Sequence, residues 1–419
     1  ALCAVAAHHD ALRTQFIRRG DGASGGWIQE VLHVGDAALP WLEVHDAGTG
    51  ATSITDVGKG LLVRFDLGEG RLLAAALVRG AGDAPDRLVV AVHHLAMDAV
   101  SWEPLLGDLE AAYDAALRGV PAALPSKTAS WRTWARYLRD ADRSGALAPL
   151  AERWEAAGKA TGLHRVLHRD LLRGPHHGLA SEETLITRLL TPEASARARE
   201  LGAADALLAA LAFALQGAQD GPLGSIDVES YGRGELPIHE PAPDVSRTVG
   251  WFTTLSPVEL PMVVTPSEAL DRVREHQRAV GDSSAAFGYL FPERHGNGDV
   301  LFNYLGTHGA PVEFLTAGEK PRLRSVRGIR LERADLAERT HRLDIHAVEG
   351  PSGSVEVTVN YRASEDATRS IETLLGHVEE AILAMATPNS PQGSPSSTSL
   401  QSGLDLSQED LDDLLEDYG

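Results

Sequence analysis

The stretch His93-His94-Leu95-Ala96-Met97-Asp98-Ala99-Val100-Ser101-Trp102 places two adjacent histidines and an aspartate at the end of a predicted strand. The run Leu88–Val92 before it is apolar and β-branched, which is typical of a buried strand. After it, Ser101 is the expected N-cap of a helix whose apolar residues recur at helical spacing as far as Gly119. Side chains at a strand end can face a cleft, so this stretch predicts a functional site.

The composition favours a globular protein with two lobes or two domains. The chain has 419 residues, of which 43% are hydrophobic, enough for one large core or two ordinary ones. Its formal net charge of −21 opposes nucleic acid or an anionic membrane surface as the main partner. A basic partner or a neutral substrate stays open. The single cysteine, Cys3, excludes an internal disulfide, and we expect no metal site.

The termini and the hydropathy favour a cytoplasmic fragment. No segment approaches the roughly 18 to 20 apolar residues of a membrane span, and the first residues lack the order of a signal peptide. The chain opens without a methionine inside a helix-like run, Ala1–Phe16, in which His8 and His9 are expected to be solvated surface residues. We therefore expect an N-terminal lobe that is truncated at its start.

The first half predicts a sheet with helices packed on it. Three runs separated by turns predict an antiparallel meander, namely Leu61–Phe65, Leu72–Val78 and Leu88–Val92. Helical spacing follows at Glu103–Leu117, Ala129–Ala141 and Leu147–Ala157. The Gly/Pro/His loop at 173–178 then predicts a boundary, which gives lobes at 1–175 and 176–386.

The second half repeats this mixture of strands and helices. Strands are predicted at Glu183–Leu190, Ser225–Ser230, Trp251–Leu255, Val300–Tyr304, Leu343–Val348 and Val355–Tyr361, the last two as a hairpin. Helices are predicted at Pro192–Leu201, Ala204–Gln216 and Ser364–Ala386. Two successive α+β halves indicate two lobes of similar architecture.

The last residues differ from the rest of the chain. Residues 387–403 are rich in Ser, Pro, Gln and Gly, which predicts a flexible linker. Residues 404–419 hold seven acidic and no basic side chains, with Leu411, Leu414, Leu415 and Tyr418 at helical spacing. Two interpretations stay open for this segment, a frayed acidic tail and a docking helix that folds onto a basic partner groove.

Later motifs extend the histidine stretch into a pattern. They are Asp205–Ala210, Glu229-Ser230-Tyr231-Gly232-Arg233-Gly234, Arg247-Thr248-Val249-Gly250-Trp251-Phe252-Thr253 and Phe302-Asn303-Tyr304-Leu305-Gly306. From Ala1 to about Ala386, the chain resembles the epimerization domains of nonribosomal peptide synthetases, which are relatives of condensation domains. The resemblance implies an α/β (α+β) fold, a V-shaped, monomeric pseudodimer of two chloramphenicol-acetyltransferase-like lobes with an active-site tunnel between them.

The resemblance also implies the chemistry. The activity would invert the Cα of an aminoacyl or peptidyl thioester that a carrier protein presents on its 4′-phosphopantetheine arm. Inversion needs acid/base groups on both faces of the carbon, and the thioester acidifies its α-proton, so no cofactor bound by the domain is expected. By resemblance, His94 and Glu229 are the acid/base pair. Which of them removes the proton stays open.

Supporting roles follow for neighbouring residues. His93 is expected to pack behind His94, and Asp98 is expected to be structural, paired with Arg233. Tyr231 is also expected to support the active site. Asn303 and Tyr304, which share a strand, are expected to bind the substrate or the pantetheine arm; Asn303 is the candidate contact for the arm or the thioester oxygen, with strand packing as its alternative role. Ser101 and Trp102 are expected either to line the tunnel or to seat the following helix.

The chain departs from the family pattern near this chemistry. The family's Glu-Gly-His-Gly-Arg-Glu is changed here, with Tyr231 replacing histidine and Gly234 replacing glutamate, and Ala99 stands where a glycine is usual. Three hypotheses remain. The first is the epimerase; the second is a condensation-type acyl transferase, which Glu229 opposes; the third is a degenerate docking scaffold, which Tyr231 and Ala99 favour. The partners implied are an upstream carrier protein and, through residues 404–419, a downstream synthetase subunit.

Overall fold

The computed structural model describes ten ranges of the chain. They are 1–19, 26–46, 53–80, 85–159, 182–219, 225–239, 241–292, 299–306, 339–350 and 352–386. The contacts divide the chain into two compact units. Of the described residues, the first holds those within Ala1–Ala146 and Ile238–Thr253, and the second holds those within Leu147–Pro237, 254–306 and 339–386.

This division differs from the one expected from the sequence. The expected boundary at 175/176 lies outside the described residues, as do the predicted linker and the acidic segment 404–419. Within the described part, Ala148–Lys159 already packs with the second unit, while Ile238–Thr253 returns to the first. Because each unit is made of segments that are not continuous in sequence, one boundary position does not describe the division.

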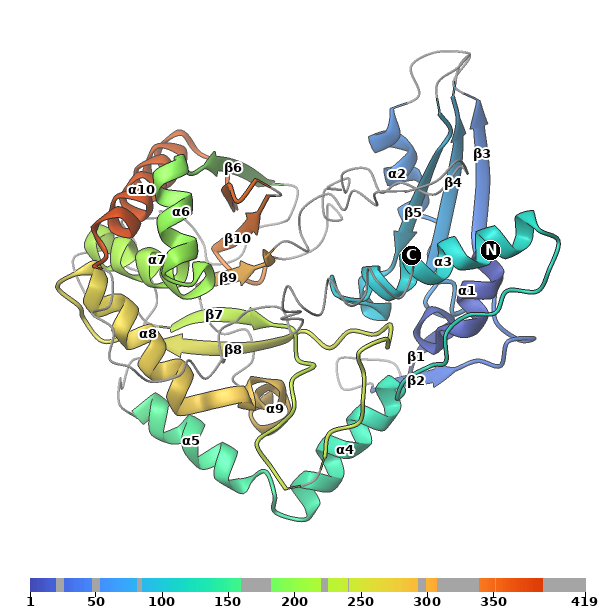
Figure 1. The fold of residues 1–419 in the computed structure, drawn as a ribbon, viewed down its shortest axis with the longest axis horizontal. Coiled ribbons are helices and arrows are strands. Elements are labelled where there is room, and N and C mark those ends of the chain that lie inside the picture. The colour runs from blue at the N-terminus through green and yellow to red at the C-terminus, as the bar shows by residue number, and fades with distance from the viewer. Residues whose placement is uncertain are drawn as a thin grey trace, which may run out of the picture. The chain divides into compact units, whose positions relative to one another are not determined.

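The first unit holds two small sheets. Strands β1 (Thr14–Arg18) and β2 (Trp27–Val31) form an antiparallel pair. Strands β3 (Trp41–Asp46), β4 (Leu73–Arg79) and β5 (Arg87–Val92) form the second sheet in that order, with β3 parallel and β5 antiparallel to β4 (Figure 1). The predicted strands that became β4 and β5 are confirmed.

The predicted strand Leu61–Phe65 is wrong. Its first residues end helix α2 (Ile54–Leu62), which begins where the Ser53 hydroxyl accepts a hydrogen bond from the Asp56 N–H. Val57 and Leu61 are buried in one cluster with alanines of β4. An apolar run of this length fits a helix end as well as a strand, and here the cap and the packing against the sheet decide for the helix.

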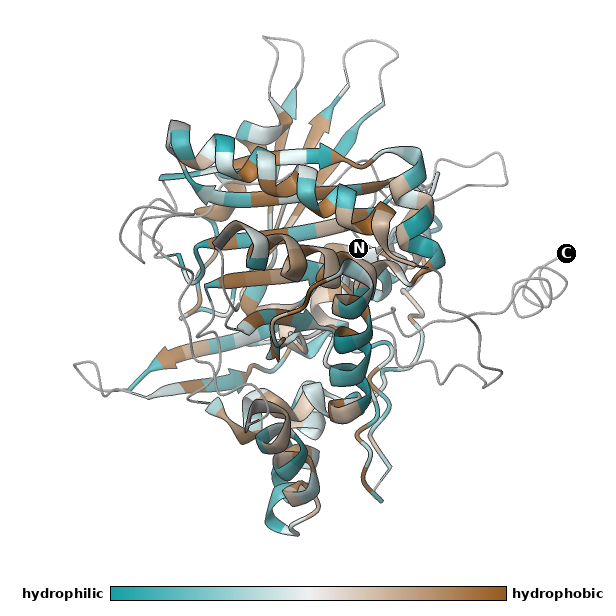
Figure 2. Cartoon of the chain, turned by 90° about the vertical axis from the view of Figure 1, so that its left-hand side faces the viewer, coloured by the Kyte–Doolittle hydropathy of each residue, from teal (hydrophilic) through white to brown (hydrophobic). Residues whose placement is uncertain are grey.

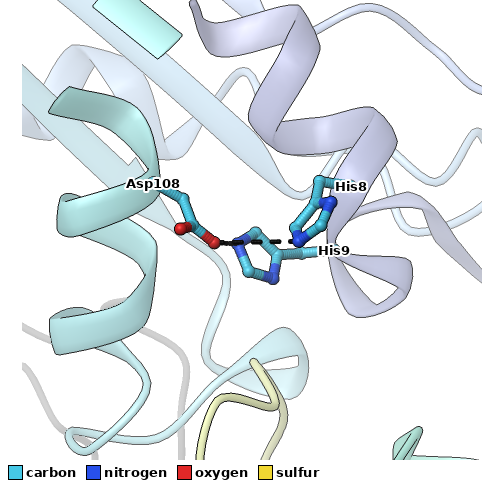
Figure 3. A group of neighbouring side chains, drawn as sticks. All are labelled: His8, His9 and Asp108. Atoms are coloured by element: carbon cyan, nitrogen blue, oxygen red, sulfur yellow. Dashed lines mark ion pairs between the residues drawn. The ribbon is translucent and has the colours of Figure 1, made fainter. Parts of the chain in front are cut away.

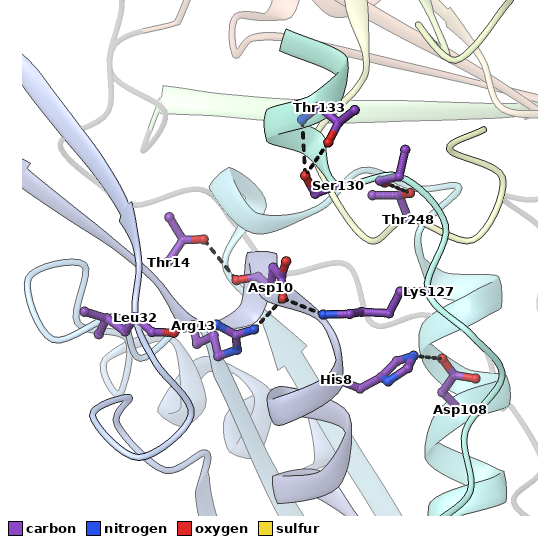
Figure 4. A network of polar contacts seen from close by, with 11 residues as sticks. His8, Asp10, Arg13, Thr14, Leu32, Asp108, Lys127, Ser130, Thr133 and Thr248 are labelled. Carbon is purple, nitrogen blue, oxygen red and sulfur yellow. Dashed lines mark hydrogen bonds and ion pairs between the residues drawn. The ribbon is translucent and has the colours of Figure 1, made fainter. Parts of the chain in front are cut away.

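A second core of the first unit contains Leu73 of β4 and alternate residues of β5, among them Val90, together with residues of the helices. The expected opening helix is shorter than predicted, because α1 (Leu2–His8) is followed by a 3₁₀ turn (Asp10–Arg13) and then by β1. Helix α3 (Trp102–Leu117) packs against α1 through Leu105, Leu109 and Val5. Helix α4 (Trp131–Arg143) starts at the Ser130 hydroxyl, which accepts from the Thr133 N–H at 3.1 Å (Figure 4).

The second unit is built on one six-stranded sheet. Its order is β6 (Glu183–Leu189), β11 (Val355–Arg362), β10 (Leu343–Glu349), β9 (Val300–Tyr304), β7 (Ser225–Ser230) and β8 (Thr254–Glu259). The described helices are α5 (Ala148–Lys159), α6 (Pro192–Glu200), α7 (Ala203–Gln219), α8 (Pro266–Val280), α9 (Ser284–Leu290) and α10 (Glu365–Ala384). Strand β8 starts at Thr254, later than the predicted Trp251, because the backbone around Trp251 bonds elsewhere.

The core of the second unit lies between one face of this sheet and helices α6, α7, α8 and α10 (Figure 1). Alternate residues of the strands, such as Val228, Phe302 and Ile345, enter this core. Figure 2 shows the corresponding hydrophobic stretches along strands and helices. In the described part of the chain, no single helix is long and apolar enough to cross a membrane. Helix α6 and part of α7 reach that length and hydropathy only together, as a pair bent by 112°.

Candidate active site

His94 stands immediately beyond the end of β5, in the first unit. The His93 N–H continues the ladder by donating to the Leu72 carbonyl at 2.9 Å, and a 3₁₀ turn, His94–Ala96, then begins. The His93 ring closes this turn, because its Nδ1 accepts from the Leu95 N–H at 3.2 Å. The His93 side chain is half-buried, while His94 is exposed.

The environments of the two histidines differ. His93 is half-buried with its ring centroid 5.4 Å from that of Phe65, and burial, followed by the neighbouring His94, lowers its pKa. The His94 ring instead lies 4.9 Å from the ring of Trp251 at an interplanar angle of 46°, and Trp251 is 42% exposed. The roles expected for His93 and His94 stay predictions.

Asp98 is buried and holds the histidine stretch against Arg247–Thr253. Its carboxylate accepts from the Ser101 N–H at 3.0 Å and from the Phe252 N–H at 3.0 Å, and its own N–H donates to the Gly250 carbonyl at 3.2 Å. Ser101 Oγ lies 2.8 Å from Asp98 Oδ1 and 3.0 Å from the Gly250 carbonyl, and it accepts from the Gly250 N–H. The two motifs, far apart in sequence, form one structural element.

This element explains three residues of the pattern. Gly250 must be a glycine, because a Cβ there would lie 2.8 Å from the Phe252 ring and 3.0 Å from that of Trp131. Ser101 is fully buried and starts α3 without a side-chain cap bond, so its hydroxyl serves the Asp98 contact instead. Trp102 is half-buried against the core of the first unit. Both observations favour the seating of the helix over contact with substrate.

The segment before α4 is fixed to the same element. The Trp131 indole N–H donates to the Trp251 carbonyl at 2.9 Å, and the hydroxyls of Thr128 and Thr248 lie 2.9 Å apart. Lys127 forms an ion pair with Asp10 at 3.0 Å (Figure 4). Sequence reasoning missed Trp131, whose only signal was its place at a predicted helix start.

Glu229 belongs to the second unit, on the face of the sheet opposite the helices. The strand registers place polar residues in one row across five strands on that face. They are Glu229 on β7, Asn303 on β9, His346 on β10, Thr358 on β11 and Thr187 on β6. Residues next to them, such as Val228 and Phe302, enter the apolar core. Because successive side chains of a strand point to opposite faces, the polar row lies on the face of the sheet away from that core.

Asn303 holds the Glu229 carboxylate. Its amide Nδ2 donates to Glu229 Oε2, and both side chains are half-buried. The contact follows from the register, because β7 and β9 are parallel and pair Val228 with Phe302, one residue before each partner. Asn303 therefore orients the carboxylate, a role that the sequence did not suggest.

Other expected site residues lie near the ends of these strands. Gly232, between Tyr231 and Arg233, has a φ of 62°, a conformation that favours glycine. The Tyr304 hydroxyl donates to Glu349 Oε2 at 2.9 Å, and burial followed by this carboxylate raises its pKa. This hydrogen bond ties the Tyr304 side chain to Glu349 of the same unit. The expected role of Tyr304 in binding the substrate stays a prediction. The Asp98–Arg233 ion pair would join the two units and stays a prediction, as do the V shape and the tunnel.

A buried contact between His9 and Asp108 in the first unit was not expected from the sequence. His9 is 5% exposed, and its Nε2 lies 3.0 Å from Asp108 Oδ2, so its prediction as a solvated surface residue is wrong. Burial lowers the pKa of His9 to about 4, although the Asp108 carboxylate opposes the change. The helix was predicted from local pattern, but its short length and its packing on α3 bring its end against Asp108.

Comparison with known proteins places the chain. Residues 1–406 match the family model described as "Condensation domain". A linear gramicidin synthase polypeptide of Brevibacillus parabrevis is 29% identical over 407 residues, which are 90% of this chain and 8% of that protein. Chondramide synthase cmdD of Chondromyces crocatus is 32% identical over 319 residues, 71% of this chain and 8% of that protein. The chain thus spans under a tenth of these two relatives.

Solved structures agree with the expected fold. The epimerization domain from the third module of tyrocidine synthetase B superposes with a TM-score of 0.72 and 26% identity, covering 91% of this chain and 88% of that one. The condensation domain of the Monacolin K polyketide synthase gives a TM-score of 0.69 at 17% identity, covering 92% and 88%. The predicted α/β fold is confirmed, and the chain belongs to the condensation-domain family.

Proposed function

We propose that this chain is an epimerization domain, which inverts the Cα of an aminoacyl or peptidyl thioester carried on the phosphopantetheine arm of a carrier protein. The observation that carries the proposal is the Asn303–Glu229 hydrogen bond, which holds a half-buried carboxylate in a fixed orientation beside the apolar core of the second unit. The likeness to a solved epimerization domain supports it.

The mechanism needs two acid/base groups. One of His94 and Glu229 takes the Cα proton, the electron pair of the C–H bond moves into the thioester as an enolate, and the other group returns a proton to the opposite face. His94 is exposed at a strand end that is fixed by Asp98 and Ser101, which suits an imidazole that must accept or give a proton. This chemistry uses the thioester to acidify the proton, so we propose that it requires no cofactor.

Asn303 donates to a carboxylate in this structure. This hydrogen bond fixes the position of the Glu229 carboxylate oxygens. In the same strand end, the Asn303 amide is also the candidate to approach the thioester oxygen on substrate binding, where a donor would stabilise the enolate. We propose orientation of Glu229 as its role before the substrate binds.

One assay tests the proposal against its alternatives. The protein is incubated with an L-aminoacyl carrier protein in deuterated water, and the released amino acid is analysed for deuterium and for configuration. Deuterium at Cα together with D-product supports epimerization. Amide formation with an added acceptor instead identifies a condensation-type transferase, and neither product with retained carrier binding identifies a docking scaffold.

Two substitutions test the assignment of the bases. His94→Ala and Glu229→Gln should each abolish deuterium exchange, because each removes a group that must carry a proton. Tyr113→Phe, a change of an exposed side chain on α3, is the matched control and should retain exchange. Exchange that survives Glu229→Gln contradicts the two-base mechanism.

The partners form a further part of the proposal. We propose that an upstream carrier protein delivers the thioester and that residues 404–419, an acidic segment, dock to a downstream synthetase subunit. Deletion of Ser402–Gly419 should weaken transfer of the product to that subunit and leave deuterium exchange unchanged. Loss of exchange would instead show that these residues belong to the catalytic unit.

A further inference from the structure

Two histidines and an aspartate converge in the first unit, away from His94. His8 ends α1, His9 follows it, and Asp108 projects from α3 toward both rings (Figure 3). His9 Nε2 lies 3.0 Å and His8 Nε2 lies 3.9 Å from Asp108 Oδ2. One nitrogen or oxygen from each residue lies within 4.8 Å of the others. Among the described residues, this is the group that offers three such ligand atoms.

Two of these atoms are buried without a hydrogen bond. His9 Nε2 and Asp108 Oδ2 have essentially no exposed surface, and although they are 3.0 Å apart, the angles between them do not form a hydrogen bond. Buried polar atoms are nearly always bonded, because an unsatisfied one costs free energy. An ion bound by both atoms would satisfy them.

The distances fit a small metal ion. Zinc bonds to nitrogen and oxygen are about 2.0–2.2 Å, so neighbouring ligand atoms of a tetrahedral site lie about 3.3–3.6 Å apart. The separations of 3.0 Å and 3.9 Å lie on either side of this value. Small rotations of the His8 and His9 side chains would equalise them.

The other oxygen of Asp108 is already held. Arg247 Nη2 donates to Asp108 Oδ1 at 2.6 Å, which fixes the carboxylate and leaves Oδ2 directed at the histidines. Such an outer contact orients metal-binding carboxylates. The Arg247 charge also opposes a cation, so the affinity should be lower than at a site without a neighbouring arginine.

We propose that His8, His9 and Asp108 bind one divalent transition-metal ion of the zinc class, with water as its fourth ligand. Two imidazoles and one carboxylate suit Zn²⁺ and Co²⁺ rather than Mg²⁺ or Ca²⁺, which prefer oxygen ligands. His8 keeps 19% of its side chain exposed and so provides a path from solvent. The bound ion would join α1 to α3 and stabilise the first unit.

This site was not expected from the sequence, because its residues are adjacent only in the fold. The same chain carries a pair with metal-binding spacing, His164 and His168, at i and i+4. That pair lies outside the described residues and serves as the matched control. It separates the proposed site from binding by other histidines.

The test measures metal binding directly. The full chain is freed of metal with a chelator and titrated with Zn²⁺ by calorimetry and with Co²⁺ by visible absorption. We expect one bound ion per chain, the intense bands of four-coordinate Co²⁺, and a Zn²⁺-dependent rise in the unfolding temperature. His8→Ala, a partly exposed position that should leave the fold intact, and His9→Gln should each weaken binding at least ~10-fold.

The control and the contrary results are distinct. His164→Ala with His168→Ala should retain the Co²⁺ bands and the rise in unfolding temperature. The proposal is overturned if His8→Ala and His9→Gln bind Zn²⁺ as the unaltered chain does, or if the His164/His168 variant loses the binding. The proposal is also overturned if the chain shows no bands of four-coordinate Co²⁺ at saturating Co²⁺. In that case His9 and Asp108 only contact each other.

Discussion

The backbone N–H of Phe252 donates to the carboxylate of Asp98 at 3.0 Å, across 154 residues of sequence. The same carboxylate accepts from the N–H and hydroxyl of Ser101. Asp98 is 3% exposed, so these donors are satisfied inside the fold. His94 is thereby supported by an interaction between two distant motifs, and not by its own strand alone.

Replacement of Asp98 should therefore destabilise the first unit. Asp98→Ala leaves the N–H groups of Ser101 and Phe252 buried without an acceptor, and we expect a loss of about 2–4 kcal/mol in the free energy of unfolding. Urea unfolding followed by tryptophan fluorescence measures it. Asp46→Ala is the control, because the Asp46 side chain is 77% exposed, and it should change the stability by less than about 0.5 kcal/mol. Equal unfolding midpoints for the two variants would contradict the role given to Asp98.

Replacing each of two glycines in the first unit by alanine should change the free energy of unfolding in opposite directions. At Gly250 a Cβ would press on the rings of Phe252 and Trp131, so Gly250→Ala should destabilise the protein by about 1–3 kcal/mol. At Gly107, an exposed position within α3, a Cβ has no neighbour within 4 Å. Gly107→Ala should stabilise by about 0.5–1 kcal/mol through helix propensity. Thermal unfolding of both variants checks the signs, and a neutral Gly250→Ala would show that the element around Asp98 can yield.

Local pattern predicted most elements of the fold. The strands Ser225–Ser230 and Val300–Tyr304 were predicted with the observed bounds, the first from alternating apolar residues and the second from a short apolar run. Helix α8 was missed, although Thr265 and Glu268 carry a capping signature, and the Thr265 hydroxyl accepts from the Glu268 N–H. Leu61–Phe65 failed because a short apolar run fits both periods.

The sequence motifs pointed to individual residues of the candidate site, but not to the hydrogen bonds that those residues form. The motifs identified Asp98, Glu229 and Asn303, yet the hydrogen bonds to Phe252 and from Asn303 depend on segments 154 and 74 residues away. A single sequence carries no signal for such pairings. His9 was misassigned for the same reason, because its burial against Asp108 is set by how α1 packs on α3.

The Asn303–Glu229 bond predicts a catalytic effect without a large effect on stability. Asn303→Ala frees the Glu229 carboxylate to rotate, and a misplaced acid/base group typically costs about 10²-fold in rate. We expect this loss in kcat for deuterium exchange on an L-aminoacyl carrier protein. Thr187→Val, at the far end of the same polar row and bonded to Thr358, is the matched control and should keep its rate. Equal rates for the two variants would remove Asn303 from the mechanism.

His276 predicts a pH dependence of stability in the second unit. It lies on α8 with its ring centroid 5.9 Å from that of Trp154, and its Nε2 is buried without a hydrogen bond. Burial lowers its pKa from 6.5 to about 4. Between these values the unfolded chain binds a proton that the folded chain does not. Stability from this group is therefore complete above pH 6.5 and is lost as the pH falls toward 4.

The expected loss is at most about 3 kcal/mol, because one pKa unit corresponds to about 1.4 kcal/mol. His276→Gln removes the titration, so its unfolding midpoint should fall less than that of the unaltered protein between pH 7 and pH 4.5. The other titratable groups are the same in both proteins, so their effects cancel in the difference between the two unfolding midpoints. His33→Gln, at an exposed histidine, should follow the unaltered protein. Parallel curves for His276→Gln and the unaltered protein would show that water reaches the His276 ring in the folded state.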